Sequence, residues 1–453
     1  MKKLLLGSTA LVAGGLMAAP AMAADPIKMG VGGYWTGYVL AGSIDSNYAT
    51  DGSSVDYKGV NLIYEGEIHF IGSTKLDNGT TVGVTVELEA HNPAQVSAAG
   101  GAAGAPQSQA AQIDESFMFA FGDWGRVEFG SRDTASYRMF YGTPSALIGF
   151  GFVQHNHQWS GVAAGNAANR AGFGYNIGAQ WQDTNRINYF TPRFAGLQIG
   201  VAYAPKIQQL TGFALGSAQL AGACGYNNGV NSGNCPVNDW QYQDQVDIGA
   251  NYLNKFGDVT LALHAAYAYA NFNPGYRANV GGANLTTGFN RAAWKQAVVG
   301  MQLGFAGFTF GVAAGWDNNG QGANYYTGVD NDTRYLTAGI MYETGPWQMS
   351  AGWGGSRNTN GNGSTSIATF ASGTSVPTAT AFSSTANAFS SSATANGLSF
   401  GQLSADKYEV GANYALGPGV KLVGGFMYYA FGGPNGATSG NSWAAVLGMD
   451  FRF

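Results

Sequence analysis

The residues that could carry chemistry in this chain of 453 residues are sparse. Charged residues make up 10% of it and five histidines are present, whereas soluble globular domains are about one-quarter charged. An acyl-transfer enzyme would need a nucleophile beside a base, but the sequence has no G-x-S-x-G elbow, and no histidine has an evident serine partner. Gly30-Val31-Gly32-Gly33 looks like part of a phosphate loop, yet no helical pattern follows it. We therefore predict that the chain is not an enzyme.

Many of the charged residues instead occupy every second position of stretches whose other positions are apolar. Glu65, Glu67 and His69 alternate in this way, and Glu87 lies between Val86 and Leu88. Successive side chains of a strand point to opposite faces. The pattern predicts strands with one apolar and one charged face, and rows of charge on such a face act on polar solutes through their field.

This period-two alternation runs through most of the chain. At the C-terminus the apolar residues from Trp443 to Phe453 take the odd positions, and Asp450 and Arg452 the even ones. In the stretch 116–121 the phenylalanines Phe117, Phe119 and Phe121 are expected to face outward. Aromatic residues near the ends of such stretches are typical of the interfacial girdles of membrane barrels; they are Tyr34, Trp35, Tyr189, Tyr252, Trp347, Trp353, Tyr414 and Tyr428.

Short turns alternate strictly with longer connections rich in Gly, Asn and Ser. The seven turns are Lys75–Gly79, Gly122–Trp124, Phe194–Gly196, Asn254–Gly257, Phe305–Gly307, Thr344–Pro346 and Leu416–Gly419. This alternation is typical of an up-and-down barrel with turns at one end and loops at the other. We predict an all-β, antiparallel transmembrane barrel of about sixteen strands that forms a single domain, residues 24–453.

The composition agrees with a barrel that has one face in lipid, since the chain contains 70 glycines, 13% aromatic residues and a mean hydropathy of -0.06. Residues 1–23 have the pattern of a cleaved signal peptide. Lys2 and Lys3 precede an apolar core that ends at Met17, and Ala21-Met22-Ala23 forms an A-x-A cleavage site. A membrane anchor is the alternative, but the core is shorter than the ~20 residues of a spanning helix.

Export predicts the redox state of the cysteines, and the net charge limits the kinds of partner. Cys224 and Cys235 lie close together in a Gly- and Asn-rich segment, and an oxidising compartment favours a disulfide between them. The net charge of -5 becomes more negative once Lys2 and Lys3 leave with the signal peptide. This acidic balance argues against a nucleic-acid partner.

Four segments resemble the Gram-negative porin family, in particular the general diffusion porins of the alpha-proteobacteria. Residues 187–198 (INYFTPRFAGLQ) resemble its strand-turn-strand signature, and residues 125–130 (GRVEFG) resemble the strand that leads into its constriction loop. Residues 416–420 (LGPGV) resemble its last periplasmic turn, and Phe453 matches the C-terminal aromatic that serves as its assembly signal. The resemblance covers essentially the whole chain after the signal peptide.

The resemblance implies a sixteen-stranded outer-membrane porin, assembled as a homotrimer and surrounded by lipid and lipopolysaccharide. It implies passive diffusion of ions and small hydrophilic solutes through a water-filled channel. The connection from Asp133 to Asp183 is the longest in the chain and is rich in aromatic residues. Because exposed disordered segments rarely carry so many, we expect this connection to fold against the inside of the barrel and to narrow the channel, as the corresponding loop does in porins.

The residues expected to line the channel lie on the strand face opposite the apolar residues, or in or near the long connection. They are Glu65, Glu67, Glu87, Glu89, Arg126, Glu128, Arg132, Asp133, Arg138, Arg170 and Arg186. A narrow passage with acids on one side and bases on the other would orient polar solutes, and the excess of acids indicates a mild preference for cations. No cofactor is expected, although acids near the connection could hold a divalent cation such as calcium. His155-x-His157 could bind a transition metal or simply be polar loop residues.

Two other functions fit the same barrel. A substrate-selective outer-membrane channel would hold one solute class at a saturable site, and a structural or adhesive barrel would bind outside partners through its long loops. The stretch from Asn358 to Gln402 is expected to be a surface loop of low complexity, and the Ala- and Gly-rich connection from Pro93 to Ala111 could reach a neighbouring subunit. Saturation of solute flux would indicate the first alternative, and loss of conductance the second.

Overall fold

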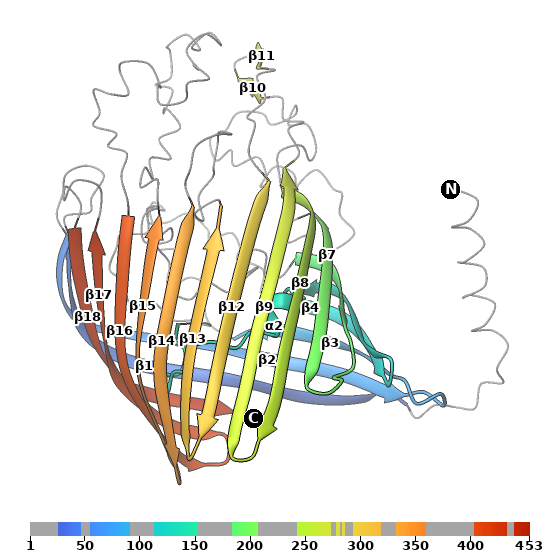
Figure 1. Cartoon of the computed structure of the whole chain (residues 1–453), viewed down its shortest axis with the longest axis horizontal. Helices are drawn as coiled ribbons and strands as arrows, with labels where there is room; N and C mark the ends of the chain where they lie inside the picture. The colour runs from blue at the N-terminus through green and yellow to red at the C-terminus, as the bar shows by residue number, and fades with distance from the viewer. Residues whose placement is uncertain are drawn as a thin grey trace.

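The computed structural model of the chain describes residues 26–46, 55–90, 113–152, 184–206, 242–272, 278–280, 283–285, 293–318, 332–358, 403–432 and 439–453. Sixteen strands close into one antiparallel barrel, in which each strand pairs with the barrel strands before and after it (Figure 1). They are β1 Lys28–Ser46, β2 Val55–Lys75, β3 Thr81–Glu89, β4 Ile113–Gly122, β5 Gly125–Arg132, β6 Thr184–Phe190, β7 Leu197–Lys206, β8 Tyr242–Phe256, β9 Val259–Phe272, β12 Trp294–Phe305, β13 Phe308–Asp317, β14 Thr333–Thr344, β15 Trp347–Asn358, β16 Leu403–Gly417, β17 Val420–Gly432 and β18 Ser439–Arg452. A separate pair, β10 Ala278–Val280 and β11 Ala283–Leu285, lies in the connection between β9 and β12.

The barrel closes where β1 pairs with β18, with Thr36 opposite Asp450. The last residue extends this ladder, because the Gly33 N–H donates to the Phe453 carbonyl at 2.9 Å and the Phe453 N–H donates to the Gly33 carbonyl at 3.1 Å. A closed ring has no free sheet edge, so the backbone polar groups of its strands find partners within the protein. The predicted sixteen-stranded antiparallel barrel is confirmed, and each of the seven predicted turns joins two paired strands.

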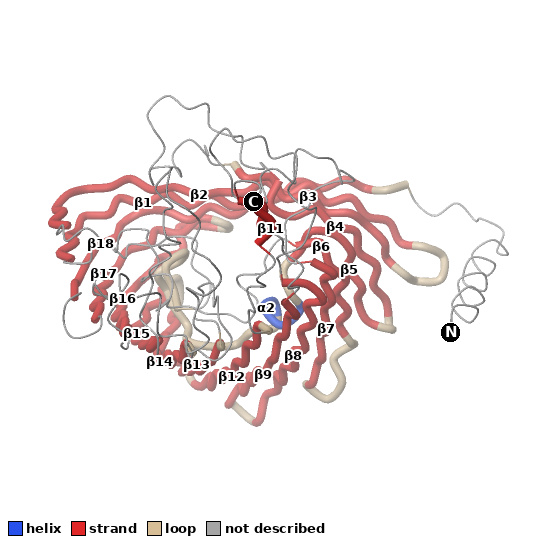
Figure 2. The backbone as a smooth tube through the Cα atoms, turned by 90° about the horizontal axis from the view of Figure 1, so that it is seen from above, coloured by secondary structure: helices blue, strands red, loops and turns tan. Residues whose placement is uncertain are grey.

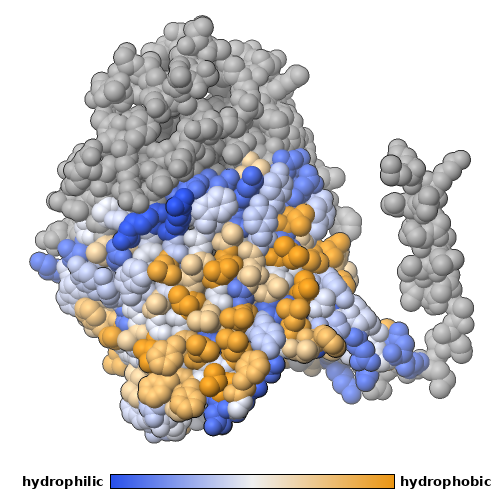
Figure 3. Space-filling model, viewed as in Figure 1, coloured by the Kyte–Doolittle hydropathy of each residue, from blue (hydrophilic) through white to orange (hydrophobic). Residues whose placement is uncertain are grey.

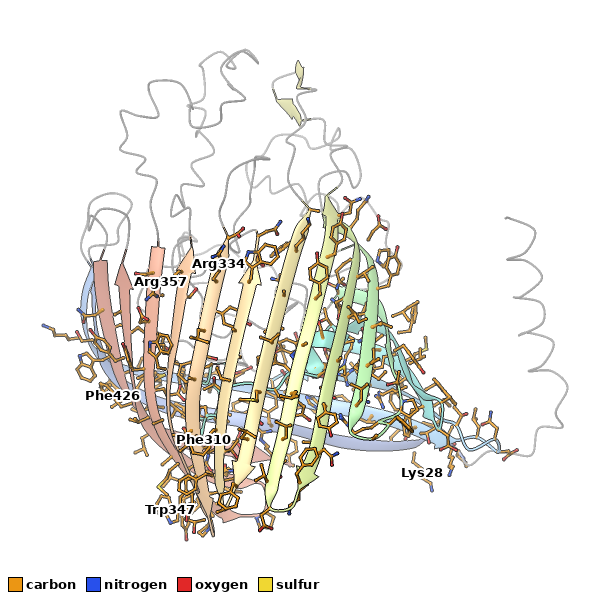
Figure 4. The ribbon with its side chains drawn as sticks, viewed as in Figure 1. Lys28, Phe310, Arg334, Trp347, Arg357 and Phe426 are labelled. Atoms are coloured by element: carbon orange, nitrogen blue, oxygen red, sulfur yellow. The ribbon has the colours of Figure 1, made fainter. Side chains whose placement is uncertain are left out.

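The outer face of the barrel is apolar, as the alternation predicts. Large apolar side chains such as Val201, Phe310 and Leu447 are exposed there. Figure 3 shows hydrophobic residues gathered on the outside of the strands, and Figure 4 shows Phe310, Trp347 and Phe426 on this outer side. Trp347 packs edge-on against Tyr414 near the turns, with ring centroids 4.8 Å apart, as an interfacial girdle requires. Among the described residues, no helix has the length and hydropathy needed to cross a bilayer.

Residues 133–152, called the inner loop below, run along the inside of the wall. They follow β5 directly, form the short helix α2 (Ala135–Arg138) and continue past β8, β12, β15 and β16 (Figure 2). Hydrogen bonds tie the loop backbone to these strands: Ser136 N–H to Asp247 (2.9 Å), Asn251 Nδ2 to the Met139 carbonyl (3.0 Å), Gln302 Nε2 to the Gly142 carbonyl (2.7 Å), Ala146 N–H to Ser350 (2.8 Å) and Asn413 Nδ2 to the Ala146 carbonyl (2.9 Å). The predicted folding of this connection into the barrel is confirmed for its described part.

The distal end of the inner loop forms the hydrophobic core with the wall. Leu147 and Phe150 are buried against Leu40 of β1 and Met427 of β17. The Tyr38 hydroxyl donates to the Ile148 carbonyl at 2.9 Å. The core of this barrel therefore lies inside it, between the loop and strands that are far away in the sequence.

Glycines occupy inner wall positions where the loop approaches closest. A Cβ at Gly411 would lie 2.8 Å from the Cβ of Leu147, and one at Gly339 would lie 2.7 Å from Cγ2 of Thr143. Contacts of this kind are too short for any side chain, so the loop can lie flat only on a wall that lacks side chains there. The loop covers the same kind of position at Gly200, Gly249, Gly300, Gly311 and Gly352.

A buried lysine holds the distal end of the loop. Nζ of Lys407 on β16 donates to the carbonyl groups of Phe150 and Gly151, the latter at 3.1 Å. The same atom lies 2.8 Å from Oε2 of Glu409, which accepts a further hydrogen bond from the Ser145 hydroxyl on its other oxygen. Both charged side chains are buried, so the pair and the loop are stable only together.

We expect Lys407→Met to destabilise the folded barrel by about 3 to 5 kcal/mol, because it leaves the Glu409 carboxylate buried without its counter-ion. Lys421→Met is the matched control. Lys421 lies on β17 and makes one side-chain hydrogen bond to the described part of the chain, to Gln348, so its loss should cost about 1 kcal/mol. Urea unfolding of the detergent-solubilised protein measures both. Equal effects of the two substitutions would show that the buried pair does not hold the loop.

Candidate functional site

The inner faces of β2 to β5 carry a dense set of charged side chains, called the charged wall below. The structure places Glu65, Glu67, Glu87, Glu89, Arg126, Glu128 and Arg132 on this wall, with Asp133 and Arg138 of the inner loop beside it. These residues lie together because β2 to β5 are consecutive in the barrel and side chains of one parity share a face. Nine of the residues singled out from the sequence thus meet in one region.

Glu128 is the carboxylate around which the arginines of this wall are arranged. Its carboxylate is buried and lies 2.6 Å from Nε of Arg126 and 3.9 Å from Nε of Arg132, while Arg138 Nη1 forms a further ion pair with it. Asn188 Nδ2 donates to it at 3.3 Å. One carboxylate therefore holds arginines from β5 and from α2, and fixes the beginning of the inner loop to the wall.

A β-bulge adds two acids that the sequence analysis missed. The register between β3 and β4 shifts between Val86 and Leu88. Asp114 and Glu115 both reach the charged wall there, since Asp114 groups with Glu67 and Glu89 while Glu115 pairs with Arg132. Strict alternation assigns neighbouring residues to opposite faces, and an extra residue in a bulge breaks that rule. No signal in this stretch distinguishes the bulge from a regular strand.

The phenylalanines of β4 face inward, so the expectation that they face lipid was wrong. Phe117 and Phe119 are buried, and the guanidinium carbon of Arg132 lies 4.5 Å from the Phe117 ring while that of Arg126 lies 4.7 Å from the Phe119 ring. Met118 is the exposed outer residue. Alternation defines two faces but not which one is inside, and stacked guanidinium groups make a phenylalanine row compatible with an aqueous face. Phe119 also fills the space over Gly83.

Two further side chains differ from expectation, Tyr34 in the face it occupies and Arg186 in its exposure. Tyr34 does not belong to an outer girdle: its hydroxyl lies 3.0 Å from Glu65 and 2.8 Å from Glu67 on the inside. Arg186 is on the inner face of β6 as expected, but it is buried. Its Nε donates to the Thr184 carbonyl at 3.2 Å and its Nη1 to Gln245 at 3.5 Å. Arg186 therefore supports the wall and does not border the channel.

The charged wall and the inner loop lie on opposite sides of the barrel interior. Seen from above, the loop follows the wall from α2 past β12 to β16, whereas β2 and β3 form the other side (Figure 2). Of the loop residues 134–152, Arg138 is the one with a charge, and it pairs with the charged wall. Acids and bases of the charged wall therefore lie side by side, and the described part of the inner loop does not place bases across the channel from them, contrary to the expectation from the sequence.

Several expectations fall on residues that the structure does not describe. Arg170, His155 and His157, the disulfide between Cys224 and Cys235, the signal peptide of residues 1–23 and the connections 93–111 and 359–402 lie outside the described ranges. They remain predictions from the sequence, as do assembly into a homotrimer, the role of Phe453 as assembly signal and a calcium ion near the loop.

A closed antiparallel barrel with an apolar outer face, an internal loop and a charged inner wall defines a β-barrel channel of the membrane. Comparison with known proteins agrees. A family model described as Gram-negative porin matches residues 7–292 and 255–453, and the chain belongs to this family. Its place is therefore the bacterial outer membrane. A search of curated proteins found no match to the chain.

Solved structures show similar folds at low sequence identity. The outer-membrane channel DcaP of Acinetobacter baumannii is 10% identical with a TM-score of 0.52, and the match covers 94% of this chain and 98% of that one. An anion-selective porin from Comamonas acidovorans is 12% identical with a TM-score of 0.46, covering 94% and 100%. A mutant of the Rh. blastica porin is 15% identical with a TM-score of 0.43, covering 94% and 100%.

Asp133, which opens the inner loop, carries a perturbed carboxyl group. Its backbone N–H donates to Glu115 at 2.9 Å, and its Oδ1 is buried and accepts no hydrogen bond among the described residues. Burial raises the pKa of Asp133 to about 6, and the guanidinium groups of Arg132, Arg186 and Arg138 only partly offset that effect. The carboxylate is therefore ionised at neutral pH at a cost to the folded state.

We expect Asp133→Asn to be more stable than the natural protein at pH 8 and to lose most of this advantage by pH 4. The folded state binds the Asp133 proton more tightly than the unfolded chain, whose carboxyl has a pKa of about 4. The destabilising effect of this group therefore fades as pH falls through about 6 and is absent below about 4. Unfolding in urea at several pH values measures the difference. A stability difference that does not change with pH would contradict the assignment.

Proposed function

We propose that the chain forms a water-filled channel through which ions and small hydrophilic solutes diffuse passively, with a preference for cations. Membership in the porin family supports the channel itself. The charge of the wall that the inner loop leaves uncovered supports the preference for cations. Seven carboxylates, Glu65, Glu67, Glu87, Glu89, Asp114, Glu115 and Glu128, lie there with three guanidinium groups, Arg126, Arg132 and Arg138.

The charges of this wall act on solutes in two ways. The excess of acids raises the local concentration of cations, since carboxylates on a concave wall focus the field into the water beside them. The paired arginines and acids also supply hydrogen-bonding groups to polar solutes, which an apolar solute cannot use when it displaces ordered water. The preference should weaken as salt rises, because the Debye length falls from about 10 Å at 0.1 M to about 3 Å at 1 M.

We expect Glu67→Gln, a change on the charged wall, to lower the permeability ratio of K⁺ to Cl⁻ by roughly two- to threefold. A unit charge about 7 Å from the ion path contributes about 0.6 kcal/mol in water. Asp77→Asn is the matched control, because Asp77 is exposed in the turn between β2 and β3 and its substitution makes the same change in charge away from the wall. Reversal potentials across a tenfold salt gradient in planar bilayers measure both. Equal shifts for both variants, or an anion-preferring natural protein, would contradict the proposal.

A substrate-selective channel is the second candidate, and the inward phenylalanine row favours it. Phe121 is 38% exposed and Arg126 lies over its ring at 5.5 Å. An exposed ring beside a cation offers contact to a solute that has both an apolar face and a negative group.

Solute-dependent block distinguishes the two candidates. A diffusion channel should show conductance that rises nearly linearly with salt and should be insensitive to benzoate at millimolar concentration. Saturable block by benzoate that Phe121→Ala weakens at least fivefold would support the selective channel. We expect no such block.

A further inference from the structure

We propose that Glu67, His69 and Glu87 form a binding site for a divalent transition-metal ion of the zinc type on the inner wall. Nε2 of His69 lies 2.8 Å from Oε2 of Glu67 and 4.0 Å from Oε2 of Glu87. The three ligand atoms all lie within 4.8 Å of one another. This site goes beyond the proposed diffusion channel, and metal binding can be measured whether or not the barrel conducts.

The barrel register brings the three side chains together on a rigid support. Glu67 and His69 are two residues apart on β2 and therefore share a face, and His69 is directly opposite Glu87 on β3. An ion with bonds of about 2.1 Å to its ligands needs them roughly 3.5 Å apart. The separations of His69 Nε2 from Glu67 and from Glu87, 2.8 and 4.0 Å, bracket this value.

Side chains outside the group hold each carboxylate by one oxygen and leave the other directed at the imidazole. The Tyr34 hydroxyl lies 2.8 Å from Oε1 of Glu67, and Arg132 Nη1 donates to Oε1 of Glu87 at 3.4 Å. In both residues the remaining oxygen, Oε2, is the one nearest His69. Outer partners of this kind orient metal ligands and tune their affinity. The arrangement points to an ion at the meeting point of the three side chains.

The chemical type of the ligand atoms determines which metal ion the site prefers. An imidazole nitrogen with two carboxylates suits zinc, nickel or copper, whereas calcium and magnesium prefer oxygen ligands alone. The site is open to the interior, because the His69 side chain is 27% exposed while Glu67 and Glu87 are 12% and 13% exposed. A hydrated ion can therefore enter from the channel and keep water in its open coordination positions.

A simpler interpretation gives these residues no metal. A protonated His69 would form an ordinary ion pair with Glu67 and a weaker one with Glu87, with Arg132 as the second counter-ion of Glu87. In that case removal of the imidazole would change the stability of the barrel but not its zinc binding. Zinc binding by the variant is therefore the decisive quantity.

Binding of an ion here would change the permeation of other ions. A bound dication neutralises two carboxylates of the charged wall, which carries the proposed cation preference. Zinc in the bathing solution should therefore lower K⁺ conductance reversibly, in a way that addition of a chelator restores. Calcium at the same concentration should act only through screening, which is weaker at a distance from the wall.

The experiment titrates ZnCl₂ into the folded, chelator-treated protein in detergent and follows binding by calorimetry. We expect one strong zinc site per chain that His69→Gln weakens at least tenfold, and that Tyr34→Phe weakens about tenfold through the loss of an outer partner. The matched control is the double variant His155→Gln/His157→Gln, which removes the His-x-His pair of the chain and should bind zinc like the natural protein. CaCl₂ in tenfold excess should not displace the zinc.

Each result is decisive. Zinc affinity unchanged in His69→Gln, loss of the strong site in the double variant, or displacement by calcium would overturn the proposal. If His69→Gln fails to fold, Glu67→Gln replaces it, since that substitution keeps a hydrogen-bond acceptor for Tyr34 and removes a metal ligand. Folding of every variant is checked by its heat-dependent electrophoretic mobility. A barrel that binds zinc as expected but does not conduct would reject the diffusion function and leave the metal site standing.

Discussion

The requirement that every backbone N–H and C=O in the membrane has a partner governs this structure. Strands satisfy it only in a closed ring, and the ring is closed here by the pairing of β1 with β18 and by the hydrogen bonds between Gly33 and Phe453. Closure also creates an interior. Each strand then has one side chain in two toward lipid, where apolar groups are favoured, and one toward the inside, where polar groups can keep water.

The same requirement explains how a loop can lie inside the barrel. The backbone of the inner loop is not part of the sheet, so its N–H and C=O groups need other partners. Side chains of the wall form these hydrogen bonds. Asn251, Gln302 and Asn413 donate to loop carbonyls, and Lys407 does so at the distal end. Glycines at the points of closest approach let the loop lie flat. A buried Lys407–Glu409 pair fits this view, since its charges are stable there because the loop carbonyls and the Ser145 hydroxyl complete their hydrogen bonds.

The inner loop and the charged wall thus occupy different sides of the interior and differ in charge. The loop occupies the side of the barrel where the wall is glycine-rich, and its own surface is nearly uncharged. The opposite side keeps its carboxylates, which are oriented by Tyr34, by the arginines and by backbone N–H groups. The electric field of the carboxylates and the space left open by the loop therefore lie together beside β2 to β5. This arrangement allows one short stretch of the barrel to set which ions pass and, in our proposal, to hold an ion itself.

Local patterns in the sequence are enough to predict the class of fold, because alternation and turn chemistry depend on neighbouring residues. Period two, the seven turns and the boundaries of the long connection at Asp133 and Asp183 can be read without any long-range information. The inward position of Glu65, Glu67, Glu87 and Glu128 also follows from parity once the apolar face is assigned to lipid. Membership in the porin family could likewise be inferred from short motifs.

Features that depend on packing between distant segments are visible only in the folded barrel. Parity cannot tell which face of β4 is inside when arginines from β5 cover its phenylalanines, nor can it locate the bulge that turns both Asp114 and Glu115 inward. Nothing near Lys407 indicates that its partners are carbonyls more than 250 residues away. The meeting of His69 with Glu87 depends on the register of two strands, which is set by the closed ring. Local sequence specifies the strands and their faces, and the three-dimensional closure specifies which side chains meet.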